Sequence, residues 1–251
     1  MSNINVQVAE VNDAFFNPRL ADNPCVSRYN LRKADFANTM TDIYEFMGDL
    51  NVMSVERGWG RFEDMLQLQA LSNVLSNLLN STMAKHSREL VVNTLPNGHP
   101  DLIRTGIYPN NLVAEAEDGV EMKATRNTGA AVDMHSAREQ DLCTFVYQVD
   151  ERRDDPGVPI AERQPLTFTG IFLGHVTEED YRHNERGERG TRTATLSKDG
   201  LSSYRRSWSI SPTSYAERYG QDAVSIFQCC EFRNRIAGKI VVFGVSFNAK
   251  A

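Results

Sequence analysis

A change of pattern along the chain most constrains how it can fold. Apolar residues recur at helical spacing over 32–50, and again over 62–85 after a Gly-Trp-Gly turn. From Pro96 onward this periodicity gives way to turn residues and short β-prone runs. We therefore expect two N-terminal helices followed by a mixed sheet, in one α/β (α+β) domain over 1–251.

Turn residues separate the segments expected to form this sheet, which are 101–107, 120–125, 142–149 and 168–176. The Pro-rich segment 151–165 and the Arg- and Gly-rich segment 181–192 are predicted to be surface loops. A short helix is expected over 197–208 and a last strand over 239–247. Helices thus precede the sheet and also interrupt it.

Composition excludes several classes of protein. With 41% hydrophobic and 24% charged residues in 251 positions, the chain is neither disordered nor fibrous, and 4 Cys are too few for a disulfide scaffold. Neither a membrane-spanning apolar run nor a secretion signal is visible, so we expect a soluble, cytoplasmic protein. The net charge of -6 excludes a uniformly basic DNA-binding protein but not a local basic surface.

Three residues carry the chemistry that we expect. Glu121 and Lys123 are two positions apart in a predicted strand, so their side chains project to the same face. Asp101, at the head of a neighbouring predicted strand, can place a second carboxylate beside Glu121. Two carboxylates suit Mg²⁺ that keeps several waters and a substrate phosphate. Lys123 could then position or deprotonate a water and stabilise developing charge. The alternative is a surface hairpin with an ion pair.

The pattern Pro100-Asp101…Glu121-x-Lys123 resembles the signature of the PD-(D/E)xK nuclease superfamily, typified by type II restriction endonucleases. The resemblance covers about 60–210 and implies a restriction-endonuclease-like mixed sheet, flanked by helices, with the motif on its central hairpin. It further implies that Asp101, Glu121 and the backbone carbonyl of Met122 bind Mg²⁺ and that Lys123 is catalytic.

Many members of that superfamily also place a Glu on a helix ahead of the motif. Glu63, at the start of the second predicted helix, is the candidate for this catalytic position. A Glu that opens a helix also interacts favourably with the helix dipole, which is the structural alternative.

Basic residues near the motif are candidates for contacts with DNA. Arg126, His135 and Arg138 follow the motif strand, and Arg189 and Arg192 belong to the Arg-rich loop. Interleaved acidic residues partly cancel both groups of charges.

These features predict a Mg²⁺-dependent restriction-type endonuclease that cuts double-stranded DNA to 5′-phosphate and 3′-hydroxyl ends. A palindromic target would call for a homodimer. The sequence has no Walker loop or dinucleotide-binding glycine pattern, so no nucleotide cofactor is expected, and its histidines lack zinc-ligand spacing. The alternatives are a DNA repair or junction nuclease with little sequence specificity, and a non-catalytic binding or regulatory protein with a chance motif.

Overall fold

The computed structural model describes residues 6–12, 15–17, 19–127, 130, 132–134, 136–150, 156–184, 193–207, 232–236 and 239–243. Its α-helices are α1 (Pro24–Arg28), α2 (Lys33–Glu56), α3 (Phe62–Met65), α4 (Leu68–His86) and α5 (Lys198–Ser207). Short 3-10 turns lie at Leu20–Asp22, Pro109–Asn111, Ile160–Glu162 and Glu178–Asp180. None of the helices in this part of the chain is long and apolar enough to cross a membrane.

A five-stranded mixed sheet forms the centre of the molecule. Its strands, in spatial order, are β2 (Leu90–Val92), β3 (Leu102–Arg104), β4 (Gly119–Thr125), β6 (Gln140–Gln148) and β7 (Thr167–Val176). Neighbouring strands are antiparallel except β4 and β6, which are parallel. The expected mixed α/β architecture is therefore confirmed.

Two smaller sheets complete the described strands. One has the order β5 (Asp133–Met134), β9 (Thr193–Leu196) and β8 (Tyr181–Asn184). The other has the order β1 (Gln7–Ala9), β10 (Phe232–Ile236) and β11 (Lys239–Phe243), and it joins the two ends of the described chain.

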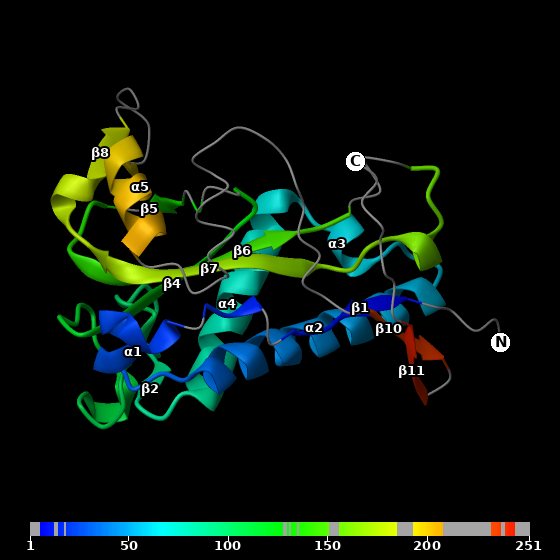
Figure 1. Ribbon diagram of the computed structural model, residues 1–251, viewed down its shortest axis with the longest axis horizontal. Helices are drawn as coiled ribbons and strands as arrows, with labels where there is room; N and C mark the ends of the chain where they lie inside the picture. The colour runs from blue at the N-terminus through cyan, green and yellow to red at the C-terminus, as the bar shows by residue number, and fades with distance from the viewer. Residues whose placement is uncertain are drawn as a thin grey trace.

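Both faces of the central sheet are covered, which explains the continuous apolar character of β6. Phe145 and Tyr147 belong to the core shared with α1, α2 and α4, whereas Leu142 and Val146 pack with Tyr204 of α5. Side chains alternate between the faces of a strand, so a strand covered on both sides is apolar at nearly every position. Figure 1 shows α2 and α4 on one side of the sheet and α5 on the other.

The first predicted helix does not end near residue 50, where its apolar pattern stops, but continues to Glu56 as α2, which runs through Gly48. A Cβ at Gly48 would lie 2.6 Å from Cγ2 of Val8. This glycine therefore allows β1 to approach α2 closely instead of ending the helix.

The second predicted helix is split. Leu66 and Gln67 are extended, with ψ of 147° and 150°, so the segment forms the short α3 and the long α4. The apolar stripe runs through this break and does not reveal it.

The strands of the central sheet also differ in part from expectation. β3 is only three residues long, because the chain turns at Gly106, where φ is +78°. The sequence patterns do not predict β2, and β8 occupies the first part of the expected loop 181–192. Residues 151–155, 185–192 and 244–247 of the predicted elements lie outside the described residues.

Candidate carboxylate and lysine site

The candidate site forms where β3 and β4 separate. Their pairing ends at Val120, and no described strand pairs with this edge of β4 beyond that point. Side chains take the place of a strand partner at this edge. The backbone N–H of Met122 donates to Oδ2 of Asp101 at 2.9 Å, and that of Ala124 donates to Oγ of Ser76 at 3.1 Å. Because backbone donors away from water need partners, Asp101 is held at the open edge of β4.

The three motif residues meet at this edge. Nζ of Lys123 lies 2.6 Å from Oε1 of Glu121, and the backbone N of Asp101 donates to Oε2 of Glu121 at 3.3 Å. The same-face relation of Glu121 and Lys123 follows from strand alternation, as expected. Met122 points to the opposite face, into the core under α4.

The two carboxyl groups have unequal tendencies to ionise. Burial opposes ionisation of Glu121, but His99 and Lys123 together lower its pKa to about 2. Burial raises the pKa of Asp101 and the Glu121 charge raises it further, against the effects of Lys123 and Asn80. The pair therefore holds one firm negative charge and a second that is disfavoured by repulsion, which a bound cation would offset.

Two residues at this site escaped the sequence analysis. Nδ1 of His99 lies 3.1 Å from Oε2 of Glu121, and the side chain of Asn80 on α4 lowers the pKa of Asp101. The usual spacing patterns of metal ligands apply within one helix or hairpin, so they do not indicate that His99 lies near Glu121 or Asn80 near Asp101. The signal that could have identified His99 is its place directly before Pro100-Asp101.

Glu63 does not join the motif residues, contrary to expectation. Its Oε1 accepts from Nδ2 of Asn51 at 2.9 Å, while the neighbouring Arg61 donates to the backbone carbonyl of Asp150. Asp150 follows the end of β6, whereas Glu121 pairs with Leu142 near its beginning. In Figure 1, α3 is labelled toward one end of the long strands β6 and β7, whereas β4 is labelled toward the other. Glu63 therefore makes a buried contact between α3 and α2.

We expect Glu63→Gln to raise stability increasingly as pH rises. Burial raises the pKa of Glu63, against the effects of Arg61 and Asn51, so the folded state holds this proton more tightly than the unfolded state. The stability that it contributes is complete below the unfolded pKa and is lost as pH rises through the folded pKa. Urea unfolding at about pH 5 and about pH 8 measures this difference. The exposed Glu45→Gln is the control. A Glu63→Gln variant that is less stable than the wild type at both pH values would contradict the expectation.

The candidate DNA contacts are only partly described. Arg126 is half-buried just after β4. Nη1 of Arg138 lies 3.3 Å from Oε1 of Glu115, and the Glu115 backbone bridges to His99. Arg138 therefore belongs to the surroundings of the site, with part of its charge already paired. The remaining candidates, His135, Arg189 and Arg192, lie outside the described residues.

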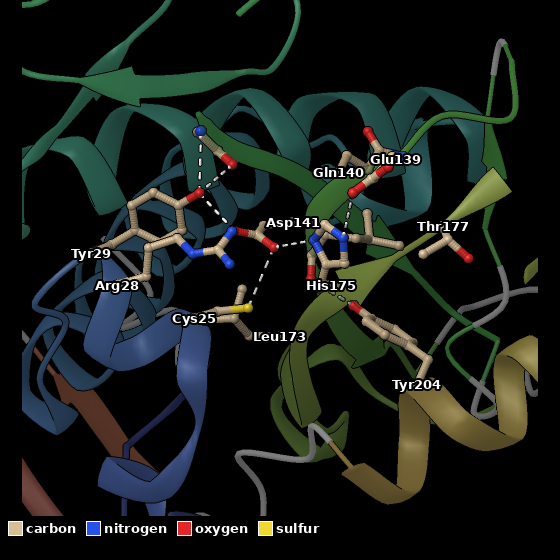
Figure 2. Close-up of polar contacts among 12 residues, drawn as sticks. Cys25, Arg28, Tyr29, Glu139, Gln140, Asp141, Leu173, His175, Thr177 and Tyr204 are labelled. Carbon is tan, nitrogen blue, oxygen red and sulfur yellow. Dashed lines mark hydrogen bonds and ion pairs between the residues drawn. The ribbon is translucent and has the colours of Figure 1, made fainter. Parts of the chain in front are cut away.

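A second polar cluster surrounds Asp141, at the start of β6. Figure 2 shows Arg28, Tyr29, Cys25 and His175 converging on its carboxylate, at distances of 2.8, 2.7, 3.5 and 2.9 Å respectively. Burial, with Asp141, raises the pKa of the Cys25 thiol to about 12, so Cys25 is not an activated nucleophile. The cluster links α1 to β6 and β7 of the central sheet, and we assign it a structural role.

Comparisons with protein-family models, with curated proteins and with solved structures found no match for this chain. In the part of the chain that the structure describes, no group of three or more His, Cys, Asp or Glu side chains is arranged to hold a metal ion. A cation at the motif would therefore be bound by two carboxylates together with other oxygens.

Proposed function

We propose that the chain is a Mg²⁺-dependent endonuclease that hydrolyses double-stranded DNA to 5′-phosphate and 3′-hydroxyl ends. The observation that carries the proposal is the separation of β3 from β4, which gathers Asp101, Glu121 and Lys123 at one sheet edge. A chance surface ion pair between Lys123 and Glu121 would not require the Asp101 carboxylate to accept from the backbone N–H of Met122, as a neighbouring strand would otherwise do. We include in the proposal a restriction-endonuclease-like fold, with its core over 60–210.

The residues at this edge fit a magnesium ion. Mg²⁺ in proteins commonly has one or two carboxylate ligands and keeps waters and substrate phosphates as the others. Asp101 and Glu121 would supply the carboxylates. Oδ1 of Asn80 is buried without a hydrogen-bond partner among the described residues, so a further oxygen lies close to Asp101. The bound ion would polarise the phosphate and neutralise charge on it.

Lys123 would act on the attacking water and on the phosphate. Its side chain is 25% exposed, whereas that of Glu121 is 10% exposed, so the ammonium can reach a ligand at the surface while the carboxylate stays in place. An ammonium at this position orients a water and stabilises the negative charge that develops on the phosphate oxygens.

The restriction type is the form of this activity that we propose, with a homodimer for a palindromic site. Arg126 directly follows the motif strand and Arg138 pairs with Glu115 beside His99, and in this proposal both contact the DNA backbone near the cut. Such contacts make binding strongly dependent on salt.

We expect purified protein to cut plasmid and phage DNA in Mg²⁺ but not in EDTA, and we expect Asp101→Asn to abolish cutting. The Asn side chain keeps the size of the Asp but removes a negative charge that the ion requires. Agarose gels of the digests measure the outcome. Discrete bands indicate a site-specific enzyme, and a continuous ladder indicates a repair or junction nuclease. Cutting that persists in EDTA or in Asp101→Asn would contradict the proposal.

A further inference from the structure

His99 contacts the motif carboxylate that is the more firmly ionised. Nδ1 of His99 lies 3.1 Å from Oε2 of Glu121, and the two side chains are only 16% and 10% exposed. An ionised carboxylate can only accept hydrogen bonds, so the form of His99 that suits this contact carries a proton on Nδ1. His99 is therefore placed to orient Oε2 of Glu121.

The backbone fixes His99 at this position. Its N–H donates to the carbonyl of Ala114 at 3.0 Å, and its own carbonyl accepts from Ala116 at 2.8 Å. The buried Asn93 donates to the next carbonyl along the chain, that of Pro100, at 3.2 Å. Because both the N–H and the carbonyl of His99 are hydrogen-bonded, its backbone holds the imidazole in one position.

Lys123, the other side chain that contacts Glu121, is held less firmly than His99. Its Nζ lies 2.6 Å from Oε1 of Glu121, at the end of a flexible and partly exposed chain. If Lys123 turns toward a phosphate, Oε1 of Glu121 loses that partner. Oε2 keeps the contact with His99, because the histidine does not share the motion.

We propose that His99 is a positioning residue, which holds the Glu121 carboxylate in one orientation while Lys123 acts on the substrate. The inference rests on the proposed function, because Glu121 must bind a cation for its orientation to matter. Outer partners that orient ligating side chains typically change metal affinity or activity by about 10–100-fold when removed.

Two substitutions distinguish the effect of the His99 N–H donor from the effect of the volume of its ring. His99→Asn keeps an N–H donor close to the position of Nδ1, whereas His99→Leu fills similar space without a donor. Mg²⁺ binding in the absence of DNA is measured by titration calorimetry, and the Mg²⁺ dependence of cleavage is measured in parallel. We expect His99→Leu to weaken Mg²⁺ binding about 10–100-fold and His99→Asn to retain most of the affinity.

A matched control tests another histidine that contacts a carboxylate. Nε2 of His86 lies 2.8 Å from Oδ2 of Asp42, at the end of α4, and His86→Leu is expected to leave Mg²⁺ binding unchanged. Urea unfolding establishes that each variant is folded. If His99→Leu does not fold, His99→Gln replaces it, because its longer side chain carries the amide beyond the position of Nδ1.

The outcomes distinguish this inference from the proposed function. Wild-type protein that neither binds Mg²⁺ nor cuts DNA would overturn both. If the wild type binds and cuts, Asp101→Asn does neither, and His99→Leu binds as the wild type does, only the role of His99 is overturned. Equal losses in the His99→Asn and His99→Leu variants would also overturn it, since the donor would then not matter.

Discussion

Lys123→Met should reduce single-turnover DNA cleavage by about 10²–10³-fold, because it removes the positive charge that would stabilise the reacting phosphate. Methionine keeps the unbranched side chain but loses the ammonium that pairs with Glu121. Quenched time courses at saturating enzyme and Mg²⁺ measure the rate of the chemical step. DNA binding in Ca²⁺, measured by gel shift, should change little, which would place the loss in the reaction itself.

The control for this substitution is Lys85→Met. Lys85 also pairs with a carboxylate, Asp42, at 2.6 Å, but it lies at the end of α4 and is 63% exposed. Exposed ion pairs contribute little to stability, so this variant should cut at the wild-type rate. Equal rates for wild type and Lys123→Met would show that Lys123 has no part in the chemistry.

Asp141→Ala should lower the free energy of unfolding by about 3 kcal/mol, because hydrogen bonds to a buried charged group contribute about 1.5–3 kcal/mol each and do not add independently. The Asp141 side chain is 1% exposed and accepts from Tyr29 at 2.7 Å and from Arg28 at 2.8 Å. The substitution leaves these donors without their shared acceptor. Urea unfolding followed by circular dichroism measures the loss.

Asp42→Ala provides the comparison, since Asp42 contacts Lys85 and His86 at the molecular surface. Its substitution should cost less than about 1 kcal/mol. Similar losses for the two Asp variants would contradict the structural role assigned to the cluster around Asp141. An Asp141→Ala protein that is fully stable but inactive would instead point to a direct role in the reaction.

Sequence patterns predict those parts of the fold that depend on local periodicity. The helical stripes locate α2 and α4, and the β-prone runs locate β6 and β7. The role of Gly48 could not be predicted, because it depends on Val8 packing against the helix from a distant strand. The break after α3 is hidden by an uninterrupted apolar pattern.

In the candidate site, too, local relations between residues are predictable from the sequence and contacts between distant segments are not. Strand alternation predicts that Glu121 and Lys123 share a face, since this relation is local. The contacts of His99 and Asn80 depend on where β3 leaves β4 and on how α4 packs against that edge. The expected role of Glu63 at the motif gains no support, because Glu63 accepts from Asn51 of α2, a contact between distant segments that no local pattern specifies.

The most direct test of the proposed function is DNA cleavage in water labelled with heavy oxygen, followed by mass spectrometry of the new ends. Hydrolysis at the Asp101, Glu121 and Lys123 site predicts one labelled oxygen in each new 5′-phosphate with wild-type protein and Mg²⁺. Asp101→Asn should give no such product under the same conditions. Unlabelled phosphate at the new ends, or the same labelled product from Asp101→Asn, would contradict hydrolysis at this site.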